Sequence, residues 1–335
     1  QEVDGVLGIA GQRVVAAVGG EVPVQVRVAP HQSGDHALLL YRIIGVSIAV
    51  FLMVRLLPGD PVDFILAHSS HAVALDPDKI RHELGLDLPV ALQYFHFLGR
   101  IIRGDLGTAI IFRQPVSELI FNELPYTARL ALLAMAFTIL IAFALGTLAA
   151  IKPNSWLDTI TMSTAVIGIS MPEFWLGMIA ILVFCVKLRW LPLVGPESFQ
   201  VLLLPALVLS LRPAAILARM LRSGLLEVMG EDYIATARAK GLRESLIILK
   251  HAMRNALLPV LTLMGLQLGG LLGGTVIIEN VFARHGMGYL AVNAILQRDY
   301  PLTQGIVLIM AVVFVMINLI VDVVYGYIDP RIRYE

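Results

Sequence analysis

Six apolar stretches constrain this 335-residue chain more than any other feature of its sequence. Each is at least about as long as the ~20 residues that an α-helix needs to cross a bilayer. They cover residues 37–57, 126–151, 157–188, 201–221, 256–278 and 302–328. Charged residues make up 15% of the chain, against about 25% in an ordinary soluble domain. The sequence therefore predicts an all-α integral membrane protein with six transmembrane helices.

The connections between these stretches predict which side of the membrane each one faces. If the first span leaves the cytoplasm, the external connections are residues 58–124, 189–200 and 279–301. The connection at 222–255 and both termini are then cytoplasmic. Seven basic residues lie between Arg219 and Arg254, and Arg331 and Arg333 follow the last span. This agrees with the enrichment of basic residues on the cytoplasmic side of membrane proteins.

Residues 58–124 form the one large polar insertion, with nine acidic and five basic residues. Asp76–Pro77 is typical of a helix start, because aspartate caps the first turn and proline is tolerated at its first position. We expect this short helix to end by Gly85, and two further helices over residues 90–103 and 116–122. The insertion is predicted to be an external helical segment, and residues 125–335 a membrane core of five spans.

A polar, basic segment from Glu231 to Pro259 interrupts the apolar pattern. A short helix over residues 233–240 is expected to end at Gly241, since glycine readily adopts the backbone angles of a sharp turn. In the helix that follows, the positions at 100° per residue predict a buried face, made of Leu242, Leu246, Leu249 and Met253. Arg243, Lys250 and Arg254 share a neighbouring face. The alternative is a solvated charged loop.

The order A-T-A-x-x-x-G over residues 235–241 resembles the cytoplasmic coupling loop, or EAA loop, of ABC importer permeases. YIATARAKGL and HAMRNALLPV are similar to the B-type permeases for dipeptides, oligopeptides and nickel. The resemblance continues through LLPGDP at 56–61 and LIVDVVYGYIDPRIRY near the C-terminus, and covers about residues 43–335. Ala235 stands where that loop has its glutamate, and Arg254 where a proline often ends it. The peptide branch commonly lacks both.

This resemblance implies a type I ABC importer permease in the cytoplasmic (inner) membrane of a prokaryote, working by alternating access. It implies as partners a second homologous permease, two nucleotide-binding ATPase subunits and an external substrate-binding protein. No nucleic-acid partner is expected. ATP and Mg would be bound by the partner subunits, with no cofactor on this chain. The residues implied in coupling to the ATPase are Tyr233, Ala235, Thr236, Ala237, Arg238, Lys240, Gly241, Leu242 and Arg243. Di- or oligopeptides are the implied cargo; a nickel chelate or a glutathione-like solute is the alternative, and a secondary transporter is the rival class.

Two groups of polar residues inside the spans are candidates for the translocation pathway or its gate. The third stretch is too long for one straight helix, and Pro172 lies at its middle, which predicts a kink or break. Ionisable groups within a membrane usually face a pathway, so Ser170, Met171, Pro172 and Glu173 form the first group. The alternative places the kink at the outer interface, with Glu173 hydrated. Asn318 and Asp322 share one face of the last span, where capping or packing is the alternative role.

Glycines recur every four residues at Gly265, Gly269 and Gly273, which indicates close packing of another helix. No lysine follows a glycine, so the chain has no G-K-[ST] phosphate loop. His82-Glu83 lacks the second histidine of a zinc-protease motif, and the one cysteine, Cys185, lies in an apolar run. An enzyme and a metal site are therefore not expected on this chain. Residues 1–36 match no pattern and stay an unassigned N-terminal extension.

Overall fold

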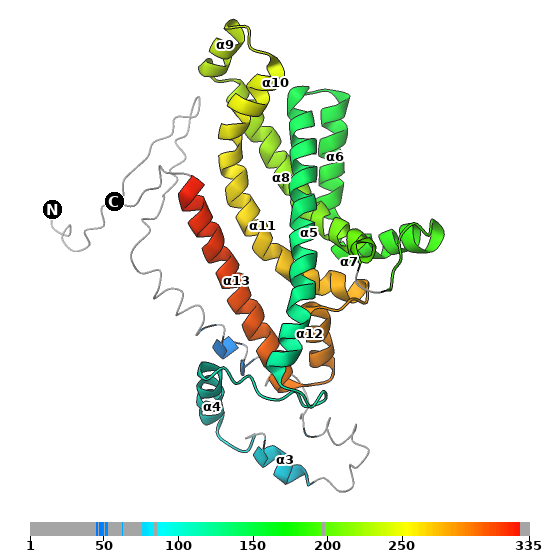
Figure 1. The fold of residues 1–335 in the computed structure, drawn as a ribbon, viewed down its shortest axis with the longest axis vertical. Helices are drawn as coiled ribbons and strands as arrows, with labels where there is room; N and C mark the ends of the chain where they lie inside the picture. The colour runs from blue at the N-terminus through cyan, green and yellow to red at the C-terminus, as the bar shows by residue number, and fades with distance from the viewer. Residues whose placement is uncertain are drawn as a thin grey trace, which may run out of the picture. The chain divides into compact units, whose positions relative to one another are not determined.

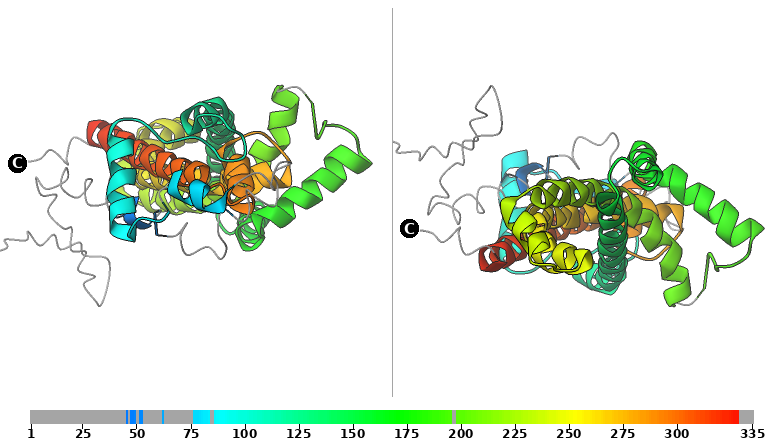
Figure 2. Two further views of the ribbon diagram at one scale, coloured as in Figure 1. Left: turned by 90° about the horizontal axis from the view of Figure 1, so that it is seen from below. Right: turned by 90° about the horizontal axis from the view of Figure 1, so that it is seen from above.

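The computed structural model describes most of the chain from residue 76 onward and a few earlier residues. The described residues are 45, 47–49, 51, 52, 62, 76–83, 86–195 and 198–328. The expected extension at residues 1–36 lies outside them, as does most of the expected span at 37–57. In the described part every named element is a helix (Figures 1 and 2), which confirms the all-α fold.

Four of the described helical runs are long and apolar enough to cross a membrane. The single-helix runs are α5 (Val116–Ile151), α8 (Phe199–Met229) and α13 (Tyr300–Ile328). The remaining run, Glu244–Val281, joins α10 (Glu244–Leu246), the π-helix η3 (Ile247–Ala252) and α11 (Met253–Val281). These runs match four of the expected spans.

The stretch expected to form the third span is broken in the middle, as the sequence predicts at Pro172. Taken as one span, it would be the fifth among the described residues. Helix α6 (Trp156–Ser170) and the continuous pair α7 (Glu173–Ala180) and η2 (Ile181–Lys187) meet at 106°. Met171 has an extended backbone, with φ −86° and ψ 133°. This is the conformation favoured in a residue that precedes proline, because the proline ring disfavours the helical one.

Helix α8 occupies the centre of the packed helices and contacts α5, α6, α7 and α11. Figure 1 shows α5, α8 and α11 running alongside one another. Small residues make these contacts close: a Cβ on Gly146 of α5 would lie 2.8 Å from the Ala218 carbonyl oxygen of α8. Larger apolar side chains such as Leu217 and Leu221 fill the space around them.

The glycines of α11 divide between packing and open positions. A Cβ on Gly265 would collide with Val321 of α13, and one on Gly269 would lie 2.7 Å from Phe314. The predicted close helix packing is therefore present at these two positions. At Gly273 a Cβ would meet no described atom within 4 Å, so the packing prediction fails there.

Outside the spans, α3 (Pro77–Glu83) and α4 (Val90–Ile102) confirm two expected short helices. Asp76 caps α3, since its Oδ1 accepts a hydrogen bond from the Asp78 backbone N–H at 3.1 Å. The separate helix expected at 116–122 is wrong, because α5 continues without a break through Pro125. Pro125 is the tenth residue of α5, where a proline removes one backbone hydrogen bond and its ring crowds the carbonyl four residues before it. The packing of α5 along α8 offsets this cost.

Two further boundaries differ from the expectation. The loop predicted to begin at residue 222 begins at Gly230, because α8 continues through Met229. The connection between the last two spans, which is expected to be external, contains α12 (Met287–Leu296), an apolar helix too short to cross a membrane. This helix is not among those expected from the sequence.

Candidate functional site

The polar segment after α8 folds into a two-helix projection, which we call the coupling knob and define as residues 231–255. Helix α9 (Asp232–Ala239) is followed by a turn at Gly241, and α10 begins at Glu244. Gly241 has φ +77°, a left-handed conformation that favours glycine. The turn is closed by the Gly241 N–H, which donates to the Arg238 carbonyl at 2.9 Å. The predicted helix, turn and second helix are thus all present, and the alternative of a solvated loop is wrong.

Two polar contacts brace the coupling knob across its turn. Arg238 Nη2 donates to Glu244 Oε1 at 2.7 Å, and Arg238 Nε donates to Oε2 at 3.3 Å. This hydrogen-bonded carboxylate raises the pKa of Arg238 further. Asn255 Nδ2 donates to the Tyr233 hydroxyl at 2.8 Å, which ties α9 to the start of α11. Because both partners of the Arg238–Glu244 pair are about half exposed, its contribution to stability is small.

The buried side of the knob matches the predicted face only at Met253, which is buried. Leu242, Leu246 and Leu249 are 37%, 42% and 66% exposed, whereas Ile247, Ile248 and Ala252 are buried. The reason is that η3 is a π-helix, in which residues five apart share a face. Ile247 and Ala252 form such a pair, and an α-helical period of 3.6 residues assigns the wrong side chains to the core.

The exposed surface of the coupling knob carries most of the residues expected to contact an ATPase. Ile234 and Ala237 of α9 are buried in one cluster with Leu221 and Leu225 of α8. Ala237 is therefore an anchoring residue and not a surface residue. The other predicted coupling residues are exposed: Tyr233, Ala235, Thr236, Arg238, Lys240, Gly241, Leu242 and Arg243.

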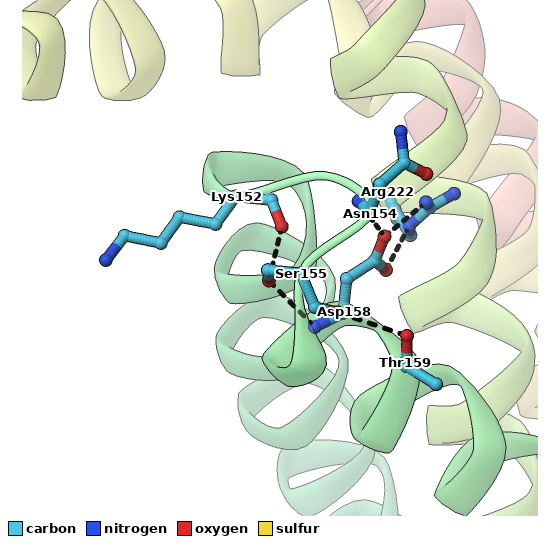
Figure 3. Close-up of polar contacts among 6 residues, drawn as sticks. All are labelled: Lys152, Asn154, Ser155, Asp158, Thr159 and Arg222. Atoms are coloured by element: carbon cyan, nitrogen blue, oxygen red, sulfur yellow. Dashed lines mark hydrogen bonds and ion pairs between the residues drawn. The ribbon is translucent and has the colours of Figure 1, made fainter.

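An ion pair joins the start of α6 to α8, at the end of these helices that lies toward the coupling knob (Figures 1 and 3). Arg222 donates from Nε and Nη2 to the two carboxylate oxygens of Asp158, each at 2.6 Å. Asp158 Oδ2 also accepts from the Asn154 backbone N–H at 2.9 Å, and Ser155 caps α6. This pair is not among the contacts expected from the sequence, although a carboxylate in the first turn of a span was a usable signal.

The break in the third span brings Glu173 close to a basic residue of α8. Glu173 Oε1 lies 3.9 Å from Arg212 Nη1, and the two side chains are 16% and 56% exposed, respectively. A Cβ on Gly274 of α11 would lie 3.1 Å from Glu173 Oε2, so glycine leaves room for the carboxylate. Arg212 is not among the candidates expected from the sequence, although it is the one charged residue of the run 201–218.

The other pathway candidates contact their own helices in the structure. Ser170 Oγ donates to the Val166 carbonyl at 2.8 Å, and Asn318 Nδ2 donates to the Phe314 carbonyl at 2.9 Å. Met171 is partly exposed at the break. Asp322 lies on α13, and its side chain is outside the part of the chain that the structure describes.

Two known protein families match this chain. Residues 142–334 match the family described as "Binding-protein-dependent transport system inner membrane component". Residues 36–131 match its N-terminal companion, "Binding-prot-dependent transport system membrane comp, N-term". The chain belongs to this permease family. It is a transmembrane permease subunit of an ABC importer, of the dipeptide, oligopeptide and nickel type.

Similar proteins include permeases named "Glutathione transport system permease protein GsiC". Those of Salmonella choleraesuis (strain SC-B67) and Pectobacterium atrosepticum are 44% identical over 290 residues, which covers 87% of this chain and 94% of each relative. The GsiC of Escherichia coli (strain K12) is 43% identical over the same length. In fold, the permease is similar to a chain of the inward-facing MetNI methionine ABC transporter, with a TM-score of 0.55 and 18% identity. That match covers 64% of this chain and 97% of the other, and supports the type I permease fold.

Family membership places the permease in the inner membrane and gives it ATPase and substrate-binding partners. Among the described residues no group of three or more His, Cys, Asp or Glu side chains could hold a metal ion. Cys185 of η2 is partly buried.

In the permease, a buried carboxylate of α11 holds the start of α12. Glu279 is fully buried, and its Oε1 accepts from the Thr127 hydroxyl of α5 at 2.6 Å. Its Oε2 accepts from the backbone N–H groups of Gly288 and Tyr289 at 2.7 and 3.2 Å. These N–H groups belong to the first turn of α12, where no helical partner exists for them. Glu279 therefore caps α12 from a neighbouring helix.

A second buried carboxylate joins the polar insertion to the last span. Asp299 Oδ2 accepts from the Ile111 backbone N–H at 3.1 Å, and Oδ1 accepts from the Leu302 N–H at 3.1 Å. Burial raises the pKa of Asp299, and these N–H groups, together with that of Ile110, oppose the shift. The carboxylate thereby caps α13 and fixes the segment before α5.

Proposed function

We propose that this importer permease carries small peptides into the cell, in the size range of di- and tripeptides. One observation carries the proposal: 44% identity over 290 residues with permeases named for glutathione, itself a γ-linked tripeptide. Permeases of this kind form a pathway that the substrate-binding protein feeds, so the solute is selected partly outside this chain. Nickel chelates are the alternative cargo within the same family.

We propose further that the pathway is shared with a second, similar permease, and that the coupling knob receives the movement of the ATPase subunits. The exposed side chains of α9 and the turn at Gly241 support this role, because they project beyond the packed core. The buried Ile234 anchors α9 to the spans, so a push on the knob is transmitted to α8 and α11. The two states of alternating access would differ by such a rigid movement.

Reconstitution of the assembled importer tests the proposed cargo. The permease, its partner permease, both ATPases and the binding protein are placed in proteoliposomes, and uptake of glutathione, trialanine and a nickel chelate is measured with ATP. We expect ATP-dependent uptake of the peptides and peptide-stimulated ATP hydrolysis. Uptake of the nickel chelate without uptake of either peptide would refute the proposal.

A further inference from the structure

An arginine lies deep within the most buried span. Arg212 is two residues from the midpoint of α8, and it is the one charged residue between Val201 and Ala218. In the most apolar stretch of α8, 67% of the residues are buried. The Arg212 side chain is nevertheless 56% exposed in this chain. Because an arginine facing lipid at this depth is costly, its exposed side must face water or another protein.

The exposure of Arg212 belongs to a polar stripe along α8. Arg219, Ser223 and Glu227 are also exposed, and they follow Arg212 by seven, eleven and fifteen residues. At 100° per residue these positions share one helical face, on which the partly buried Ile216 is an apolar member. The opposite face is buried. A polar face that runs from the middle of a span to its end at the coupling knob is typical of a helix that lines a water-filled route.

The contact between Arg212 and Glu173 is loose, which leaves the guanidinium able to bind something else. Its 3.9 Å separation exceeds the about 2.7–2.9 Å of a charge-assisted hydrogen bond. In the same chain, Arg222 and Asp158 show such a tight pair at 2.6 Å. A guanidinium has five N–H donors in a planar fork that matches a carboxylate. Arg212 is thus held in place by Glu173 without being saturated by it.

We propose that Arg212 is a carboxylate-binding point on the translocation pathway. The C-terminal carboxylate of a small peptide would bind the guanidinium and replace its loose contact with Glu173. When the peptide leaves, the contact between Arg212 and Glu173 would form again. The inference rests on the proposed peptide transport and adds to it a residue that recognises the cargo inside the permease.

The test measures binding of two probes, trialanine and trialanine amide, to the importer in lipid nanodiscs. The assembly contains both permeases and both ATPases, and the binding protein is left out. Both probes carry the same ammonium group, but only the free acid has the carboxylate. Arg212→Met should weaken binding of the free acid about tenfold, the loss expected for one charge-assisted contact, and leave the amide unchanged. Arg212→Lys keeps the charge but not the planar fork of donors, so its affinity for the free acid should lie between those of the unchanged importer and Arg212→Met.

Arg219→Met is the matched comparison, since Arg219 lies on the same face about two turns along α8. We expect this variant to keep the preference for the free acid. Equal binding of acid and amide by the unchanged importer, an unchanged preference in Arg212→Met, or an equal loss in Arg219→Met would overturn the inference. If one of these results is found but the unchanged importer still takes up peptides in proteoliposomes, the role of Arg212 is refuted and the proposed peptide transport is not. If it takes up no peptide at all, the proposed function fails and the inference with it.

Discussion

At the scale of single residues, Gly241 carries a conformation that few other residues tolerate. Its φ of +77° costs residues with a Cβ about 1–2 kcal/mol. A Cβ at this position would meet no described atom within 4 Å. A substitution therefore strains the turn without disturbing the packing of the chain itself, and the surface it adds points toward whatever contacts the knob.

We expect Gly241→Val to leave the permease folded in the membrane but to abolish ATP hydrolysis stimulated by loaded binding protein. A β-branched side chain is poorly tolerated at positive φ and would also fill the contact surface. Gly241→Asn should keep more activity, because asparagine adopts this conformation more readily. Lys240→Ala should be mild. Normal stimulated hydrolysis in Gly241→Val would show that this turn does not transmit the movement.

The buried carboxylate of Asp299 gives a prediction about pH. Because burial raises its pKa, the folded permease binds this proton more tightly than the unfolded chain does. Its contribution to stability is therefore complete below the unfolded value of 3.8 and decreases as pH rises through the raised folded value. Asp299→Asn should remove this slope from thermal unfolding measured across pH, and cost about 1–3 kcal/mol because one backbone N–H loses its acceptor. The exposed Asp78→Asn is the control; an equal change in slope there would contradict the assignment.

At the scale of elements, the glycines of α11 separate packing from open surface. We expect Gly265→Ala to lower the free energy of unfolding by about 1–3 kcal/mol, because its Cβ would collide with Val321 of α13. Gly273→Ala, on the same helix, should be neutral or stabilising by up to about 1 kcal/mol, since alanine favours the helix and the space is open. Thermal unfolding of the two purified variants distinguishes them, and equal melting temperatures would count against close α11–α13 packing.

Elements with a strong local signal could be predicted from the sequence, and contacts between distant elements could not. The break at Pro172 and the turn at Gly241 follow from the backbone restrictions of single residues. The π-helix η3 has no local signal, because its buried pairs depend on how it packs against α8 and α9. The same holds for Arg212 and Glu173, which are far apart in sequence and meet only because α6 and α7 bend by 106°.

At the scale of the whole molecule, the polar insertion has apolar side chains that stay exposed among the described residues. Helix α4 has no buried residue, and Phe95 and Ile102 are 65% and 78% exposed. We expect removal of residues 76–104 to impair uptake more than membrane insertion, because the spans that drive insertion stay intact. The milder Phe95→Ser, Ile102→Ser variant should weaken binding of the binding protein or the partner permease. Unaltered uptake in both variants would refute a docking role for this insertion.

The helical run Glu244–Val281 has a mechanical consequence. With a rise of 1.5 Å per residue, its 38 residues extend over roughly 55 Å. One end begins at the coupling knob, and the other ends beside Glu279, whose carboxylate grips the first turn of α12. Under the proposed coupling, this run would act as a lever arm: a tilt of about 5° at the knob would displace the far end by about 5 Å over that length. The contact that holds α12 would then be the point where a small rotation at the knob becomes a movement at the far end of the run.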